Sequence, residues 1–581
     1  MQPEARKKTR RSAAAPTKEA PPPAVSFGAK IRGAVGSTFG QALVGAALLW
    51  LALPPMDLWP LAWIAPIFWL LLIRRRELAG RRPYRGIWLA GFFFWLAAYH
   101  WLRLPHWATS FGWVALAFYL SFYLPVFIGL SRVAVHRLGV PLIVAAPTIW
   151  TGLELARAHL LTGITMGDLG HTQYRWISLI QVSDLAGAFA VSFVVMFVAA
   201  CLARGIPFEG QLRCTRALIP GMVVLAAVLA YGYVRTSGPQ PAPSLRVALI
   251  QGSIDSILKY DPSKRDTNYD HYRQWSRTAL QQAAERNEKV DLMVWPETML
   301  REPLLTYDAD AGLPPGWKMP LAEFRQRLPR EAAHSAWAVG QLAAEMRVPM
   351  IVGLDEIHYA ADRIDVFNAA ALLSPTGEVR GTYDKQHLVM FGEYVPWADR
   401  FPLLQRLTPL PMSLDAGRRP AAFAAGGLRF SPNICYESVL SHVIRRHVNE
   451  LARAGREPDV LMNLTNDGWF WGSSELDMHL ACGVFRAVEC RKPFLVAANT
   501  GFSAWIDADG RIRARGPRHA PGVVMAQVGR DPRRSWYLAM GDWPAGLCLA
   551  FAGVVAMAGV GDRWRRWRNA TPLKHFGEQD G

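Results

Sequence analysis

Seven long apolar stretches fill most of the first 236 residues of this 581-residue chain, and one more lies near its carboxyl end. A membrane-spanning helix needs about 20 apolar residues to cross a hydrocarbon core about 30 Å thick. Two stretches are short for this, so tilt or flanking tryptophans such as Trp50 and Trp59 must help them. The pattern predicts a polytopic α-helical membrane domain of eight helices, seven in residues 38–236 and the eighth in residues 540–561. The stretches are residues 39–53, 58–73, 86–102, 112–135, 140–155, 185–203, 218–234 and 543–560.

Basic residues indicate how these helices are oriented, because Lys and Arg near helix ends stay on the cytoplasmic side. Of the 64 Lys and Arg, the two tails and the even-numbered connections hold 24, whereas the odd-numbered short loops hold two or three. This alternation predicts that both termini are cytoplasmic and that the long insert between the seventh and eighth helices is not. It also explains the net charge of +18 without nucleic acid, so no nucleic-acid partner is expected.

The two ends of the chain have the composition of solvated basic tails. Residues 1–37 combine Pro and Ala with eight basic residues, and we expect them to be a disordered cytoplasmic tail. Residues 562–581 are expected to be a second basic cytoplasmic tail. The first apolar stretch begins after more than 35 residues and no small-x-small site follows it, so it is interpreted as a retained anchor.

From residue 245 the pattern changes to short β-rich runs separated by amphipathic helices, which is typical of a layered α/β domain. We expect this domain to span residues 245–535. Turn signals ending at Gly377 and Gly510 predict two hairpins. The expected strands are residues 246–251, 292–295, 350–353, 367–374, 379–384, 430–434, 460–464 and 494–498.

Three reactive side chains follow separate predicted strands. They are Glu297 in VWPET, Lys385 in YDKQH and Cys435 in NICYES, spaced 88 and then 50 residues apart. In open α/β folds the chemistry lies beyond the carboxyl ends of strands, so these side chains are candidates for one site. Taken one at a time, each is more simply a buried cysteine or a solvated charge. Their shared position is what favours a common function.

The three residue types suit acyl transfer through a nucleophilic cysteine. A thiol with a pKa of about 8.5 is only a few per cent ionised near neutrality, so it needs a base or a cation beside it. A carboxylate alone is a weak base for it, by about 6 kcal/mol. A lysine ammonium about 4 Å away adds about 4 kcal/mol at an effective dielectric near 20. Glu297, Lys385 and Cys435 would thus serve as base, electrostatic stabiliser and nucleophile.

The other five cysteines do not suggest a second site. With no CxxC and no regular spacing, a disulfide scaffold and a cysteine-based zinc site are excluded. Cys201, Cys214 and Cys548 lie in or beside apolar stretches, and Cys482 and Cys490 fall on a predicted helix. No metal and no diffusible cofactor are expected, because acyl transfer through a cysteine needs neither.

The motifs around these residues resemble those of the nitrilase superfamily, and among its members those of the apolipoprotein N-acyltransferases. VWPET, YDKQHLVMFGEYVP, NICYES and NLTNDGWF are similar to that family's signatures in order and spacing, and the resemblance covers nearly the whole chain after the basic tail. Two residues depart from the pattern: Met390, where the family commonly has Pro, and Gly468, where Ala is frequent. The resemblance implies an α-β-β-α sandwich as the catalytic domain, placed in the periplasm.

The resemblance also implies roles for individual residues. Glu297, Lys385 and Cys435 would be the catalytic triad, with the oxyanion held by Lys385 and the N–H after Cys435. Four more residues would bind substrate or orient the triad: Glu393 in FGEYVP, Tyr436 and Glu437 after the cysteine, and Trp469 in NDGWF.

The implied function is a two-step acyl transfer in the bacterial inner membrane by a multi-pass protein acting as a monomer. Cys435 would take an acyl chain from a phospholipid as a thioester and pass it to the α-amino group of diacylglyceryl-cysteine on an apolipoprotein. The partners would thus be the phospholipid donor, the apolipoprotein acceptor and the bilayer.

Two other functions remain open on the sequence alone. A membrane-anchored amidase of the nitrilase type would use water as acceptor and release free acid. A non-catalytic membrane sensor or transporter would keep its function without Cys435 and would place more ionisable residues within its helices.

Overall fold

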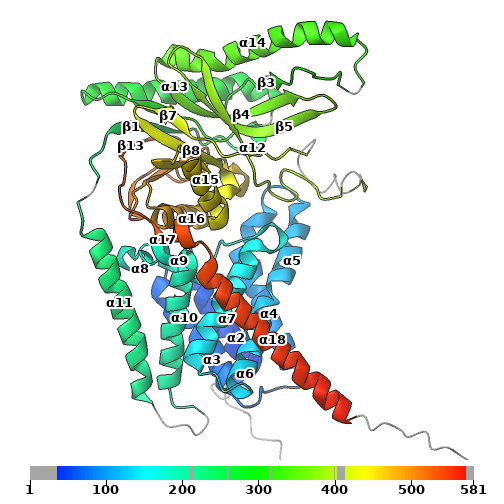
Figure 1. The fold of residues 1–581 in the computed structure, drawn as a ribbon, viewed down its shortest axis with the longest axis vertical. Coiled ribbons are helices and arrows are strands. Elements are labelled where there is room, and N and C mark those ends of the chain that lie inside the picture. Colours follow the sequence, from blue (N-terminus) through cyan, green and yellow to red (C-terminus); the bar gives the residue numbers. More distant parts are fainter. Residues whose placement is uncertain are drawn as a thin grey trace, which may run out of the picture.

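The computed structural model describes residues 36–570, apart from residues 209–213, 240, 260, 315, 398–399, 402 and 404–412. The expected tail of residues 1–37 therefore lies almost wholly outside the described residues. Of the second expected tail, residues 562–581, the part from residue 571 onward also lies outside them, whereas residues 562–570 continue the last helix. The chain has two parts, a helical bundle and, beyond one end of it, a layered α/β domain (Figure 1).

All eight apolar stretches of the sequence are helical. Four helical segments are long and apolar enough to cross a membrane: Thr109–His136, Ala188–Gly205, Thr215–Thr236 and Trp543–Gly561. The segments Thr38–Ala52 and Trp59–Arg74 are apolar but shorter. A membrane-embedded helical part is thus supported, and eight crossings remain a prediction. The helices of this part are α2 Thr38–Ala52, α3 Ala65–Arg74, α4 Pro83–Ala98, α5 Thr109–Leu120, α6 Tyr123–His136, α7 Leu142–His159, α8 Ile177–Ile180, α9 Ser183–Ala186, α10 Ala188–Gly205, α11 Leu218–Thr236 and α18 Trp543–Ala570.

The α/β domain consists of two stacked sheets between two pairs of helices, as the resemblance to the nitrilase superfamily implies. The first sheet has the order β13-β1-β2-β4-β5-β6, with β3 beside β4, and the second has the order β12-β11-β10-β9-β8-β7. The strands are β1 Leu245–Gln251, β2 Leu292–Val294, β3 Leu304–Tyr307, β4 Met350–Tyr359, β5 Ile364–Leu373, β6 Val379–Asp384, β7 Phe423–Ala425, β8 Leu428–Ile434, β9 Val460–Thr465, β10 Phe494–Ala498, β11 Ala504–Ile506, β12 Ile512–Arg515 and β13 Gly522–Val528.

Alternation along the strands builds the core between the sheets. Val247 and Leu249 of β1 and Phe430 and Ile434 of β8 meet in one buried apolar cluster. Helices α13 (Arg265–Glu285) and α14 (Leu321–Met346) contribute to a second cluster on the outer face of the first sheet. Helices α15 (Ser441–Arg453) and α16 (Glu475–Cys490) cover the second sheet, on the side that faces the bundle (Figure 1).

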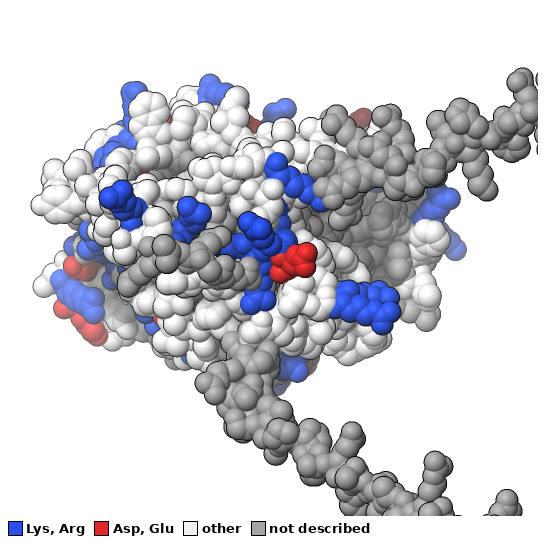
Figure 2. Space-filling model, turned by 90° about the horizontal axis from the view of Figure 1, so that it is seen from below, with Lys and Arg blue, Asp and Glu red and all other residues white. Residues whose placement is uncertain are grey.

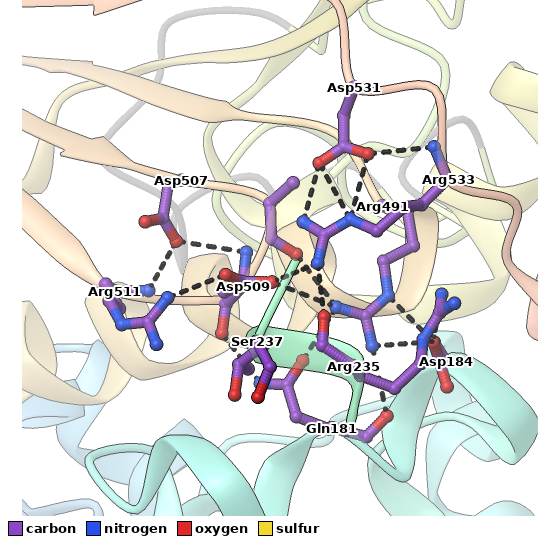
Figure 3. A network of polar contacts seen from close by, with 12 residues as sticks. Gln181, Asp184, Arg235, Ser237, Arg491, Asp507, Asp509, Arg511, Asp531 and Arg533 are labelled. Atoms are coloured by element: carbon purple, nitrogen blue, oxygen red, sulfur yellow. Dashed lines mark hydrogen bonds and ion pairs between the residues drawn. The ribbon is translucent and has the colours of Figure 1, made fainter. Parts of the chain in front are cut away.

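Helix α16 joins the two parts into one structure. All 16 of its residues are buried, because the sheet covers one side and membrane-part helices cover the other. Phe485 of α16 and Ile180 of the membrane part belong to the same apolar cluster. Just after the helix, the Arg491 guanidinium contacts Asp184 and Gln181 of the membrane part (Figure 3). The α/β domain is therefore docked by a shared core and by buried charges.

Candidate active site

The three candidate catalytic residues come from both sheets and lie close together. Glu297 follows β2 and Lys385 follows β6, both in the first sheet, and Cys435 follows β8 in the second. The carboxyl ends of these strands lie together where the two sheets meet, so residues far apart in the sequence share one site. The structure thus brings the three sequence-predicted residues together.

Lys385 lies between two carboxylates. Its Nζ is 2.8 Å from Oε1 of Glu393 and 3.7 Å from Oε1 of Glu297, and its side chain is 1% exposed. Burial opposes the charge on Lys385, but Glu393, Cys435 and Glu297 together raise its pKa above the ordinary value. Lys385 is therefore an ammonium ion at neutral pH and supplies a fixed positive charge beside the cysteine.

Asn368 of β5 is a site residue that sequence reasoning missed. Its Nδ2 donates to Oε1 of Glu297 at 2.6 Å and to Oε1 of Glu393 at 3.1 Å. The remaining oxygens are held by the main chain, since Asn466 N donates to Oε2 of Glu297 and Val389 N to Oε2 of Glu393. These hydrogen bonds therefore hold the Glu297 and Glu393 carboxylates in place beside the Lys385 ammonium. The signal in the sequence is a single Asn within the apolar run VFNAAALL.

Cys435 occupies a strained turn directly after β8. Its φ of +51° lies in the left-handed region, which is unusual for a residue other than glycine and costs about 1–3 kcal/mol. The side chain is half-buried. Burial raises the pKa of the Cys435 thiol well above its usual range, the Glu297 carboxylate adds to this, and the Lys385 ammonium opposes it. The resting cysteine is therefore a thiol that must lose its proton to a base as it reacts.

Glu437 holds the cysteine turn against the lysine loop. Its fully buried carboxylate accepts hydrogen bonds from Ile434 N at 2.7 Å, Gln386 N at 2.8 Å and His387 N at 3.0 Å. The Tyr383 hydroxyl donates to it as well, at 2.8 Å. Four donors from two sheets converge on one carboxylate, so Glu437 acts by positioning Cys435 relative to Lys385.

Tyr436 points toward the membrane part. Its hydroxyl donates to the Gly163 carbonyl at 2.6 Å, in the segment that follows α7. Its ring also stacks on His387, with centroids 6.1 Å apart. The residue next to the candidate nucleophile therefore ties the site to the helical bundle.

Trp469 lies half-buried in the short helix η9 (Asp467–Phe470), after β9. The neighbouring Phe470 packs edge-on against Trp101 of the membrane part, with ring centroids 4.9 Å apart. This places the NDGWF segment at the junction of the two parts.

Asp467, Glu475 and His479 bring three possible metal-ligand atoms within 4.8 Å of one another. Hydrogen bonds already engage two of them, because Asp467 Oδ1 lies 3.2 Å from His479 Nδ1 and Ser438 Oγ lies 2.7 Å from His479 Nε2. Burial and the Asp467 carboxylate raise the pKa of Glu475 well above its usual range, which favours a neutral acid there. The arrangement is that of a hydrogen-bonded network under the cysteine turn.

Comparison with known proteins agrees with both parts of the chain. A model of the apolipoprotein N-acyltransferase N-terminal domain matches residues 45–201, and a carbon-nitrogen hydrolase model matches residues 246–537. The fold, the site and these matches define a carbon-nitrogen hydrolase domain joined to a membrane helical bundle.

Relatives identify the family more closely. An apolipoprotein N-acyltransferase of Geobacter metallireducens is 34% identical, over 89% of this chain and 94% of its own length. Those of Rhodopirellula baltica and Azotobacter vinelandii are 30% and 32% identical, over 89% and 88% of this chain and 96% and 93% of their own lengths. A crystal structure of a Nesterenkonia amidase shares 16% identity and a TM-score of 0.32, covering 52% of this chain and 96% of that one. The chain belongs to the apolipoprotein N-acyltransferase family.

Proposed function

We propose that this protein transfers an acyl chain from a phospholipid, through a thioester on Cys435, to the N-terminal amine of diacylglyceryl-cysteine on apolipoproteins. One observation carries this proposal: Lys385 lies between Glu297 and Glu393, next to the strained Cys435. Tyr436, the residue after this cysteine, contacts the membrane part. A nucleophile placed there can meet substrates that are anchored in a bilayer.

In the first half-reaction, Glu297 takes the Cys435 proton as the sulfur attacks the ester carbonyl of the phospholipid. The new C–S bond replaces the ester C–O bond through a tetrahedral oxyanion, which Lys385 and the N–H after Cys435 stabilise. The departing oxygen takes the proton from Glu297 and leaves as the lysophospholipid alcohol. The acyl chain remains on Cys435.

In the second half-reaction, the α-amino group of the acceptor attacks the thioester. An α-amine with a pKa of about 7.7–8.0 is partly neutral near pH 7 and needs little activation. Glu297 accepts the amine proton and returns it to the departing sulfur, so the enzyme is regenerated as the thiol. A thioester divides one difficult transfer into two easier steps.

The residues assigned as positioning groups act through the triad in this scheme. Glu393 holds the lysine, Glu437 holds the cysteine turn, and Tyr436 and Trp469 set the side of the site that faces the bundle. No metal or diffusible cofactor enters either step. The protein is proposed to act as a monomer.

The membrane arrangement is part of the proposal. Eight crossings place both tails and the even-numbered connections in the cytoplasm and residues 245–535 in the periplasm, with residues 38–236 and 540–561 in the bilayer. Lys and Arg gather on the face of the bundle opposite the α/β domain, with few acidic residues among them, which supports this orientation (Figure 2). The exposed arginines include Arg76, Arg81 and Arg82 of the connection between α3 and α4, and Arg85 in the first turn of α4.

Mass spectrometry tests the first half-reaction. Purified protein incubated with phosphatidylethanolamine carrying an isotope-labelled acyl chain should gain that chain on the peptide that contains Cys435. The Cys435→Ala variant should gain nothing, and Cys482→Ala, which removes a thiol buried in α16, should behave as the wild type. A label that never reaches Cys435 would overturn the proposal.

A further inference from the structure

A group of nitrogen donors lies beside the candidate active site, where the loop after β6 meets α15. We call Gln386, His387, His442 and Arg446 the donor cluster. Arg446 Nη2 donates to Gln386 Oε1 at 3.3 Å. His442 stacks on His159 at the end of α7, with ring centroids 4.3 Å apart, and His387 stacks on Tyr436. The cluster therefore lies between the end of a membrane helix and the residue next to Cys435.

The donor cluster has more donors than acceptors. Among the residues that the structure describes, the buried atoms Gln386 Nε2, His387 Nε2 and His442 Nδ1 have no hydrogen-bond partner. Arg446 likewise forms no ion pair with any described carboxylate, and its side chain is exposed. Buried polar groups are normally paired, so three such atoms beside a guanidinium that has no carboxylate partner indicate a place for a ligand that supplies acceptors.

The electrostatics at the donor cluster favour an anion. Burial is the largest of the effects that lower the pKa of His442 to about 3, and His159, His387, Arg446 and Arg445 contribute to this lowering in that order. For His387, burial and the Lys385 ammonium lower the pKa, whereas a hydrogen bond to the Thr162 backbone and then the Glu393 carboxylate oppose them. The Glu393 oxygens already bind Lys385, Asn368 and Val389. Both histidines are therefore neutral near pH 7, and the Arg446 guanidinium, which pairs with no described carboxylate, supplies the positive charge that an anion would meet here.

The donor cluster lies at the end of α7, so in the proposed membrane arrangement it falls near the headgroup level of the bilayer. Leu160 and Leu161 follow His159 directly and expose 53% and 64% of their surfaces. Two adjacent exposed leucines at the end of a membrane helix suit contact with acyl chains. The donors beside them lie where phosphates of phospholipids would be.

We propose that the donor cluster binds the phosphodiester of the phospholipid that donates the acyl chain. The planar guanidinium of Arg446 can donate two parallel hydrogen bonds to phosphate oxygens. Gln386, His387 and His442 can donate further hydrogen bonds to the same oxygens. In a phospholipid only a few bonds separate the phosphate from the ester carbonyl, so a phosphate held here keeps the ester near Cys435. This inference rests on the proposed function, and it explains how one site distinguishes a donor that carries a phosphate from an acceptor that does not.

Two acyl donors test this inference in single-turnover experiments with the purified full-length protein. One is phosphatidylethanolamine and the other is p-nitrophenyl palmitate, which has no phosphate. Arg446→Gln and His442→Ala should each raise the concentration of phosphatidylethanolamine for half-maximal thioester formation about tenfold, with little change in the maximal rate. Neither variant should alter the reaction with p-nitrophenyl palmitate. Arg453→Gln, an exposed arginine at the end of α15, is the matched control and should leave both reactions unchanged.

Competition distinguishes the lipid headgroup from a free anion. Glycerophosphoethanolamine should slow thioester formation from the phospholipid in the wild type and not in Arg446→Gln. Equal competition by inorganic phosphate would overturn the assignment to a headgroup, as would unchanged half-saturation in both variants. An equal loss of thioester formation with both acyl donors would mean that Arg446 and His442 have only a structural role, which would also overturn the assignment. If the wild type formed a thioester with neither donor, the proposed function itself would fail.

Discussion

Arg491 of the α/β domain and Asp184 of the membrane part form an ion pair at 2.6 Å, with both side chains fully buried. Arg235 of α11 also pairs with Asp184, at 2.7 Å, and Asp509 lies 3.4 Å from Arg491 (Figure 3). Charges this deep are tolerated only when they are paired and hydrogen-bonded. The contact therefore makes the α/β domain and the bundle depend on each other for stability.

Removing one partner of this pair should destabilise the whole protein. Asp184→Ala leaves the Arg491 charge buried, and we expect a loss of about 3–5 kcal/mol in the free energy of unfolding. Tryptophan fluorescence during denaturation in detergent measures it. Arg277→Ala is the control, because Arg277 pairs with Glu345 at 2.6 Å on the surface and should contribute only about 0–1 kcal/mol. Similar losses in the two variants would contradict this reading.

Glu437 should matter more for stability than the tyrosine that donates to it. In Glu437→Gln an amide NH₂ replaces one acceptor oxygen and faces main-chain donors, so we expect a loss of about 1.5–3 kcal/mol. Tyr383→Phe removes only one donor and should lose about 1 kcal/mol. Chemical denaturation of both variants checks the order. A larger loss in Tyr383→Phe would argue against the positioning role of Glu437.

The pH dependence of Cys435 alkylation should report the charges around it. Because the pKa of the thiol is raised, less thiolate is present at a given pH, so the alkylation midpoint should lie above the usual value of about 8.5. The Glu297 carboxylate raises this pKa and the Lys385 ammonium lowers it. Glu297→Gln should therefore move the midpoint down and Lys385→Met should move it up. Peptide mass spectrometry after iodoacetamide treatment gives the midpoints, and a shift of either in the opposite direction would contradict the geometry.

Asn368 should affect catalysis without touching the nucleophile. Asn368→Ala frees both carboxylates from their shared donor, and we expect thioester formation to slow by about 10–100-fold. Asn368→Asp adds a third negative charge beside Lys385 and should slow it at least as much. Single-turnover rates give the comparison, with Asn449→Ala on α15 as an asparagine control outside the site. Rates equal to that of the wild type would show that Asn368 does not orient the carboxylates of Glu297 and Glu393.

The convergence of Glu297, Lys385 and Cys435 could be predicted from the sequence because each of them closely follows a strand with clear apolar patterning, while their catalytic roles stay a prediction. Strands β1, β6 and β10 lie within a residue of their expected ranges for the same reason. The sequence predicts β4 and β5 as shorter than they are, since their outer halves carry polar residues such as Asp355 and His358. The resemblance to the family is confirmed by the matched relatives.

Other features depend on contacts that no local pattern reveals. Strand β13 was not predicted, although it pairs along all seven residues of β1, because its partner lies about 280 residues away in the chain. The strain at Cys435 has no glycine to mark it. Asn368 and Arg491 resemble ordinary polar residues until the fold places them against buried partners. The number of membrane crossings also stays a prediction, since several bundle helices are shorter than the bilayer requires.

The central claim is that the acyl group on Cys435 passes to an amine rather than to water. The acyl-enzyme, formed from labelled phosphatidylethanolamine and freed of excess lipid, is chased with a diacylglyceryl-cysteine peptide or with buffer alone. We predict that the peptide accelerates loss of the label from Cys435 and gains an equal amount of label as an N-terminal amide. Decay of the thioester at the same rate with and without the peptide, with all label released as fatty acid, would contradict the account.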